Sequence, residues 1–192
     1  MKPVTLSGRR VRLEPLSPEH HADLCRVGLE PSLWARTTIR VRTPAEMTAY
    51  IQMALDSQAS GHTLPFVIVL QDSNTIVGTT RFHSIVPVHR RCEIGFTWIG
   101  QPWQRQGINL ESKYLLLLHA FEEWQYGRVE FKADAENEPS RRALLALGAV
   151  EEGVMRRYMV SEYLGVRDLA LYSIVAADWP RVKARLLTRL VR

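Results

Sequence analysis

Hydrophobic and polar positions along the chain follow two periods, one typical of strands and one typical of helices. Alternation or β-branched runs predict strands at residues 10–16, 64–70, 75–85, 90–99, 128–133, 150–160 and 167–175. Helical spacing between capping residues predicts helices at residues 18–28, 43–61, 109–125 and 138–147, with a last one from residue 178. The order βααβββαβαββα predicts a mixed α+β fold.

Local signals mark several of these boundaries. Thr43 is followed three residues later by Glu46, which is a capping box and predicts a helix start there. Gly148 ends the helix at 138–147, because glycine takes the left-handed conformation at a helix C-terminus without strain. The connections between residues 64 and 99 are too short for crossover helices, so those three strands should form an antiparallel meander.

Composition places the chain among globular proteins. Its 192 residues are 46% hydrophobic and 23% charged, which predicts one domain over residues 1–192. No apolar run approaches the roughly 18 residues of a membrane span, and no apolar signal core follows the N-terminus. Cys25 and Cys92 stand alone, in no metal-like spacing, which favours a reducing cytoplasm and core packing.

The formal net charge of +5 is modest, and much of the excess lies in residues 181–192. A solvated helix face explains such a run better than RNA binding does. Aromatic residues interleaved with basic ones would favour nucleic acid, but the tryptophans are scattered among unrelated elements. Nucleic acid is therefore the less favoured partner, whereas an anionic ligand such as a nucleotide phosphate fits the charge.

The most informative segment is the loop at residues 100–107, between a strand and a helix. The first amides of that helix have no acceptor within the helix, and the helix dipole is positive at this end. A phosphate could be held there by backbone donors if Gly107 leaves the approach open, and Arg105 would add charge. A tight turn with no ligand is the alternative interpretation. The absence of Gly-x-Gly-x-x-Gly and the meander before the loop argue against a dinucleotide fold.

Four ordered segments resemble the GNAT (GCN5-related) N-acetyltransferases, within them the branch that acetylates ribosomal-protein N-termini. Residues 104–109 resemble the pyrophosphate motif Arg/Gln-x-x-Gly-x-Gly/Ala, with Asn109, a candidate helix cap, in place of the small residue. The other matches are Glu-Ile-Gly-Phe at 93–96, Asn-x-x-Ser to Leu-Gly at 137–148, and Glu-Gly-x-x-Arg at 152–156. The resemblance covers nearly the whole chain and implies the GNAT fold, with a mostly antiparallel sheet whose strands splay at the cofactor.

The resemblance implies an acetyl-CoA site and no metal. The pyrophosphate would lie on the amides of Gln106, Gly107, Ile108, Asn109 and Leu110, with Arg105 nearby. The pantetheine arm would pair like an extra strand with the main chain of Thr97, Trp98 and Ile99, at a bulge. The remaining implied cofactor contacts are Asn137, Ser140 and Arg142. Arg142 is equally well explained as a solvated surface residue.

The resemblance also implies direct attack of a neutral amine on the thioester, with Glu93 as the candidate proton acceptor. We expect burial to raise the pKa of Glu93. A structural ion pair between Glu93 and Arg81 or Arg91 is the alternative. Many family members protonate the departing thiolate with a tyrosine seven positions after the motif asparagine. That position is Leu144 here, so the role passes to Ser140, to water or to no group at all.

Several further side chains have two interpretations each. Tyr158 could enter the site from the last hairpin or be a packing residue of its strand, and His83 and His89 could line the site or lie on the surface. The acceptor could be a protein N-terminus or a small-molecule amine, bound by the loop at 30–42 and the last hairpin. The alternatives to an enzyme are a GNAT-fold module that binds CoA without turnover and a ribosome- or RNA-associated basic protein. The last strands and the terminal helix also offer a surface through which two copies of the chain could form a homodimer.

Overall fold

The computed structural model describes residues 2–37 and 39–191, and their elements follow the predicted order with one addition, β1. The α-helices are α1 (His21–Gly28), α2 (Pro44–Ala59), α3 (Ile108–Leu118), α4 (Glu138–Leu147) and α5 (Trp179–Val191). The strands are β1 (Leu6–Ser7), β2 (Val11–Pro15), β3 (Leu64–Leu70), β4 (Ile76–Val86), β5 (Arg91–Ile99), β6 (Arg128–Asp134), β7 (Val150–Ser161) and β8 (Gly165–Val175). The α+β prediction is confirmed.

The strands form a single eight-stranded sheet in the order β1-β2-β3-β4-β5-β6-β8-β7. Neighbours pair antiparallel, as the meander predicted for β3 to β5 requires, except for β5 and β6, which are parallel. That parallel pairing covers three residue pairs, from Arg91 with Arg128 to Glu93 with Glu130. Beyond Glu93 the ladder stops although both strands continue, so the sheet splays open between them.

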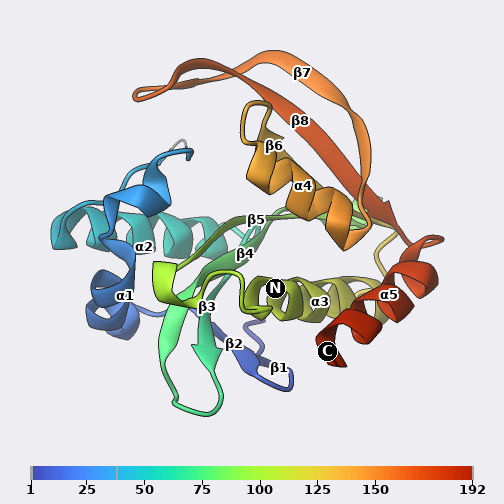
Figure 1. Cartoon of the computed structure of the whole chain (residues 1–192), viewed down its shortest axis with the longest axis horizontal. Coiled ribbons are helices and arrows are strands. Elements are labelled where there is room, and N and C mark those ends of the chain that lie inside the picture. The colour runs from blue at the N-terminus through green and yellow to red at the C-terminus, as the bar shows by residue number, and fades with distance from the viewer. Residues whose placement is uncertain (1, 38, 192) are drawn as a thin grey trace.

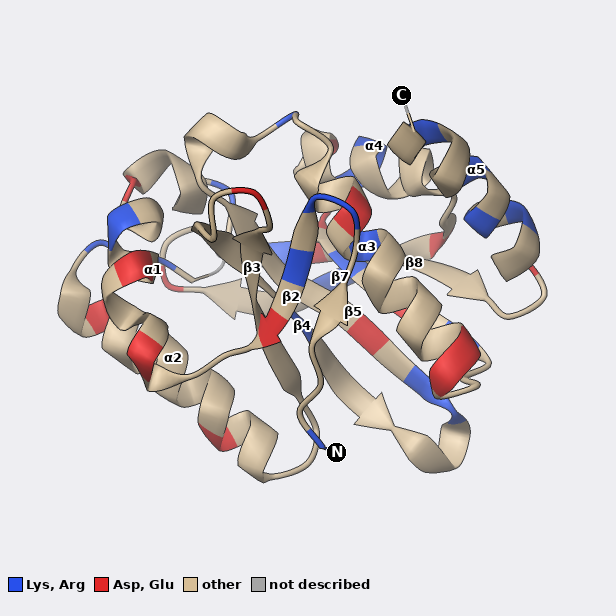
Figure 2. Ribbon diagram, turned by 90° about the horizontal axis from the view of Figure 1, so that it is seen from below, with Lys and Arg blue, Asp and Glu red and all other residues tan. Residues whose placement is uncertain are grey.

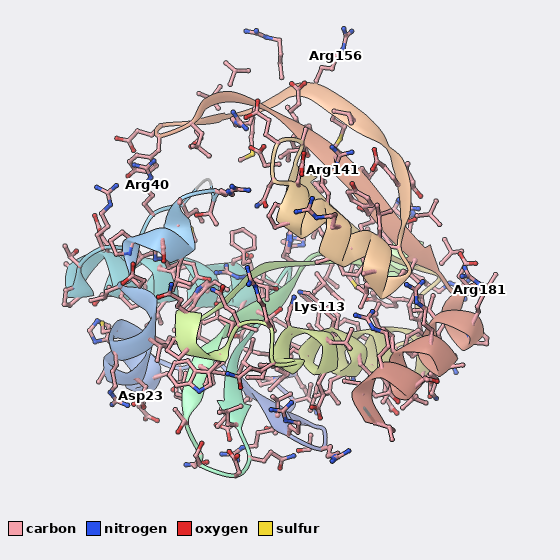
Figure 3. The ribbon with its side chains drawn as sticks, viewed as in Figure 1. Asp23, Arg40, Lys113, Arg141, Arg156 and Arg181 are labelled. Carbon is pink, nitrogen blue, oxygen red and sulfur yellow. The ribbon has the colours of Figure 1, made fainter. Side chains whose placement is uncertain are left out.

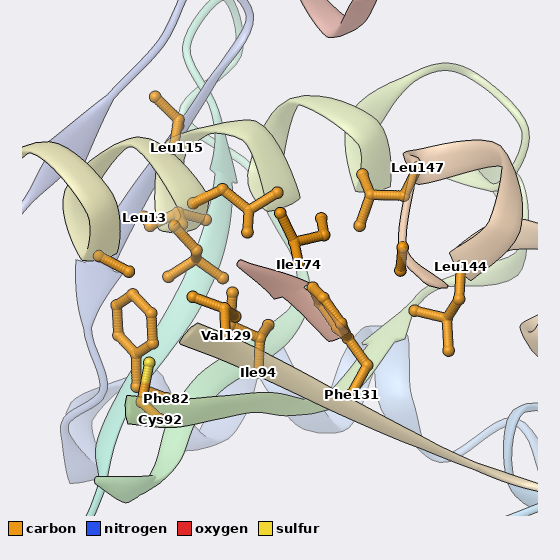
Figure 4. Packing of buried hydrophobic residues seen from close by; sticks show 14 of the residues in the cluster. Leu13, Phe82, Cys92, Ile94, Leu115, Val129, Phe131, Leu144, Leu147 and Ile174 are labelled. Atoms are coloured by element: carbon orange, nitrogen blue, oxygen red, sulfur yellow. The ribbon is translucent and has the colours of Figure 1, made fainter. Parts of the chain in front are cut away.

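Helices cover both faces of the sheet (Figure 1). On one face α1 and α2 pack with a cluster that includes Met47, Val67 and Trp98. On the other face α3, α4 and α5 close the larger core, part of which Figure 4 shows around Phe82 and Cys92. Burial raises the pKa of the Cys92 thiol, so Cys92 is a packing residue there, as expected.

Helix ends agree with their sequence signals where a side chain or a glycine defines them. Thr43 and Glu46 form both bonds of the capping box, and Gly148 takes a φ of 107° after α4. The predicted helix at 109–125 is different: α3 ends at Leu118 and a π-helical turn, His119–Glu123, follows. Hydrophobic spacing does not distinguish such a turn from a continuing helix.

The β7–β8 hairpin extends beyond the rest of the sheet and arches over it (Figure 1). Its tip contacts the segment after α1, where the Arg40 guanidinium lies 4.2 Å from the centre of the Tyr163 ring. Arg40 and α2 lie on the same side beneath the hairpin in Figure 3. No helix within the described ranges has the length and apolar character that crossing a membrane requires.

Candidate active site

Two helix N-termini flank the opening between β5 and β6. The strands run parallel, so their carboxyl ends lie at the same edge of the sheet, and α3 follows one strand while α4 follows the other. Each helix directs its positive end and its unpaired amides toward that edge. An extended anionic ligand could therefore enter the opening with its charged part at the helix ends.

The loop before α3 leaves the first amides of that helix open to an approaching ligand. Gly107 is the N-cap of α3 with a φ of 81°, and no side chain caps this helix end, so the prediction that Asn109 is the cap was wrong. A Cβ on Gly107 would have a single near neighbour, Nη1 of Arg10, at 3.6 Å. Asn109 lies exposed in the first turn instead. The amides of residues 108–110 are thus without a side-chain cap, as a phosphate site needs.

Basic residues from the β1–β2 turn surround this loop, in addition to the predicted Arg105. Arg10 donates a 2.6 Å hydrogen bond from Nη1 to the Gln106 carbonyl, and the buried Glu111 carboxylate accepts from the amides of Arg9 and Arg10. Figure 2 shows this basic turn beside α3. A pocket of about 280 Å³ lies between the turn and the loop. Sequence patterns do not predict this contact, since the partners lie about a hundred residues apart.

The predicted pantetheine strand, residues 97–99, lies at the end of β5. A register shift between Thr79–Trp98 and Arg81–Gly95 marks a bulge at Phe96 and Thr97, and Phe96 has a φ of 50°. Trp98 turns its side chain into the α1–α2 cluster, and the Ile99 carbonyl accepts a 2.9 Å bond from the Gln104 side chain. Because main-chain groups alternate in direction along a strand, part of this segment faces the opening and part faces β4.

The residues predicted on the opposite side of the opening lie at the start of α4. Asn137 is its N-cap and accepts a 3.3 Å hydrogen bond from the Ser140 amide. Ser140 is half-buried in the first turn, whereas Arg142 pairs with Glu138 in solvent. Leu144, at the position of the family tyrosine, is buried in the core.

Glu93 lies where the two strands part, and its surroundings differ from the prediction in two respects. Its carboxylate contacts Lys132 Nζ at 2.8 Å and His83 Nε2 at 3.3 Å, not Arg81 or Arg91. Burial alone would raise the pKa of Glu93, but hydrogen bonds and charge from His83 and Lys132 outweigh it, and the pKa is lowered. The expected raised pKa was therefore wrong. Strand alternation identifies which face a residue occupies, but not its partner.

His83 lies in a pocket instead of on the surface. Its ring packs edge-on against Phe96, with centres 5.0 Å apart, and a Cβ on Gly95 would come within 2.6 Å of its Nε2. Gly95, the glycine of the Glu-Ile-Gly-Phe match, therefore leaves room for the His83 ring against β5. The pocket measures about 430 Å³ and reaches from α2 to Phe96. His89 is exposed, and so is half of Tyr158, whose ring lies 5.6 Å from Lys132 Nζ.

Lys113 on α3 was not found from the sequence. Its side chain is buried beneath the bulge, and Nζ donates to the Thr97 hydroxyl at 2.5 Å and to the Thr80 hydroxyl at 3.5 Å. Figure 3 labels it on the sheet side of α3. Burial lowers the pKa of Lys113 to about 7. The neighbouring Glu111 and Ser112 are buried as well, and the sequence carries no signal that these three polar side chains are inside the protein.

Replacing Lys113 with methionine is expected to stabilise the protein by about 1–4 kcal/mol at pH 6. The change removes a buried charge, while methionine fills nearly the same volume as the aliphatic part of the lysine side chain. The unfolded chain holds the lysine proton up to pH ~10.4, whereas the native protein loses it near pH 7. Wild-type stability thus rises across that window, and the gain from Lys113→Met should shrink toward pH 10. Urea unfolding at pH 6 and pH 9 measures this. The control is Lys183→Met, at the surface. An equal gain in the free energy of unfolding of Lys113→Met at both pH values would contradict the lowered pKa of Lys113.

Comparisons with known proteins agree with this geometry. A family model described as "Acetyltransferase (GNAT) domain" matches residues 10–150. This chain is 34% identical to the Uncharacterized N-acetyltransferase YoaA of Bacillus subtilis (strain 168) over 105 residues. The match covers 55% of this chain and 58% of YoaA, so the chain spans little more than half the length of that relative.

Solved structures extend the similarity over almost the full chain. A GCN5-related N-acetyltransferase from Brucella melitensis superposes with a TM-score of 0.90 at 27% identity, covering 98% of this chain and 86% of that one. Mycobacterium smegmatis RimJ, in complex with CoA-disulfide, has a TM-score of 0.82 at 26% identity, covering 97% and 95%. With a family model over most of its length and this splayed sheet, the chain belongs to the GNAT acetyltransferase family.

Proposed function

We propose that this protein transfers the acetyl group of acetyl-CoA to a primary amine by direct attack in a ternary complex. The observation that carries the proposal is the opening between β5 and β6, with uncapped amides at residues 108–110 on one side and the Asn137 cap on the other. The pyrophosphate would lie on the loop at residues 105–110, and the pantetheine arm along residues 97–99. The Asn137 and Ser140 side chains would face the arm from the other side.

The acceptor amine must be neutral to attack. Its nitrogen forms a bond to the thioester carbonyl carbon, the carbon–sulfur bond breaks, and one amine proton leaves. Glu93 is the proposed proton acceptor, directly or through water, because its lowered pKa keeps it ionised at neutral pH. His83 adjoins both the Glu93 carboxylate and the pocket, so an amine bound in the pocket would lie near this pair. The thiolate takes up a proton from Ser140 or from water.

The first test measures cofactor binding. Acetyl-CoA at a hundredfold excess over its Kd is expected to add about 2.7 kcal/mol to the free energy of unfolding, which raises the Tm by roughly 5–10 °C. NAD and ATP, which share the adenine nucleotide but lack the pantetheine arm, should leave the Tm unchanged. The absence of any shift with millimolar acetyl-CoA would refute the proposal.

Thiol release from acetyl-CoA in the presence of an amine mixture then separates an enzyme from its rivals. Release that depends on the amine supports transfer. Binding without release would favour a CoA-binding module, and salt-sensitive retention of RNA without CoA binding would favour the RNA-associated alternative. Because the acceptor side contains a defined pocket beside Glu93, amine-dependent release is the expected result.

A further inference from the structure

Arg81 is a buried cation in the acceptor-side pocket. It lies in the middle of β4 opposite Gly95, and only 4% of the residue is exposed. Its guanidinium lies 4.0 Å from the centre of the Phe96 ring and 5.1 Å from that of Tyr50. Across residues 2–37 and 39–191, no carboxylate lies within ion-pair distance of it and no hydrogen bond from its side chain is formed.

This arrangement leaves a charge without an anion. Cation–π attraction to two aromatic rings is weaker than the cost of removing a guanidinium from water. The nearby acid, Glu93, is already engaged by Lys132 and His83. The planar donors of Arg81 are therefore available for a group that the chain itself does not supply.

The pocket around Arg81 has the size and lining of a small-molecule site. Its volume is about 430 Å³, its walls include Met53, Ile85 and Phe96, and its polar groups include His62 and His83. Phe96 belongs to the β5 bulge, so a group bound at Arg81 lies one side chain from the opening between β5 and β6. An amine attached close to that group would therefore be held beside the proposed thioester position.

We propose that Arg81 binds a carboxylate of the acceptor, so that the acceptor is an amino acid or a peptide whose first residue is acidic. This inference rests on the proposed acetyl transfer and narrows its substrate class. A bidentate contact with the guanidinium fixes the carboxylate, and the neighbouring amine points toward the bulge. Polycationic amines are disfavoured, because Arg81 would repel them.

Matched acceptors test the proposal with thiol release as the readout. One pair is leucine and leucinamide, with rates compared per neutral amine because the carboxylate raises the pKa of the leucine amine. The other is a C-terminally amidated peptide that begins with aspartate and the same peptide beginning with asparagine. In at least one pair the carboxylate form should have a kcat/KM higher by about 10- to 100-fold, mainly through KM, as expected for a charge-assisted bidentate contact. The pair that responds identifies the source of the carboxylate. Equal rates within both pairs would overturn the inference.

Two variants link the preference to Arg81. In Arg81→Met the ratio between carboxylate and amide forms should fall toward one, and Arg81→Lys should recover part of it. Arg91→Met, whose arginine pairs with Glu130 instead, is the control and should keep the wild-type ratio. An unchanged ratio in Arg81→Met would also overturn the inference. Failure of the acetyl transfer itself looks different, since then no amine of any kind releases thiol.

Discussion

Replacing Glu93 with glutamine is expected to lower kcat/KM for amine acetylation by about 100- to 10,000-fold while the affinity for acetyl-CoA stays unchanged. The amide has nearly the same shape but cannot accept the amine proton. Lys132 and His83 would also lose a charged partner, so a lower Tm is expected in addition. Because the pKa of Glu93 is lowered, its contribution to stability is full at pH 7 and is lost only as the pH falls through that lowered value.

The neighbouring Glu130 offers a matched control. It lies opposite Glu93 in the β5–β6 register and pairs with Arg128 at 2.8 Å and Arg91 at 3.5 Å, outside the pocket. Glu130→Gln should therefore lower the Tm without the loss of rate. If Glu93→Gln lowers the Tm but leaves kcat/KM unchanged, the role of Glu93 is structural and not catalytic. A stable Glu93→Gln protein with near-normal turnover would clear it of both roles.

Replacing Gly107 with aspartate is expected to weaken acetyl-CoA binding by about 100-fold relative to Gly107→Asn. Both side chains tolerate the left-handed backbone found here, with a φ of 81°, so the pair differs mainly in charge. The aspartate would repel the pyrophosphate and would also attract Arg10, whose Nη1 lies 3.6 Å from the Cβ position. Its cost should therefore appear in Kd and not in folding.

Calorimetric titration with acetyl-CoA measures the difference directly, and Tm values without ligand verify that both variants fold. Equal Kd values for the aspartate and asparagine variants would mean that the loop at residues 100–107 is only a turn. A weaker but detectable effect of Gly107→Asn is expected from its volume, because the amide nitrogens of residues 108–110 are reached past this position.

The sequence predicts the fold well because its signals are local. Alternation defines most of the strands, and the capping box at Thr43 and the glycine at 148 define helix ends through contacts a few residues apart. The two-residue β1 is too short to show a period, and hydrophobic spacing does not distinguish the π-helical turn after Leu118 from a continuing α-helix. The family resemblance adds the loop at residues 104–109 and Glu93 as candidate site residues, and the structure has Glu93 in β5 and the loop between β5 and α3.

The partners within the site could not be predicted in the same way. Lys132 reaches Glu93 from 39 residues away, and Arg10 reaches Gln106 in the loop before α3 from 96 residues away. Such contacts depend on the strand order of the sheet, which alternation does not determine. Arg81 and Lys113 look like ordinary polar residues in sequence, and only the packing around them shows that both are buried.

The divergence of β5 and β6 gives the sheet two free edges in its interior. Free edges recruit other extended chains, and proteins commonly protect those at the rim. Here one rim is blunted, since β1 has two residues, and the other rim, β7, is interrupted by two register shifts. The interior edges are instead flanked by α3 and α4. The molecule therefore offers backbone donors and acceptors to a narrow extended ligand at its centre, inside the fold instead of at its margin.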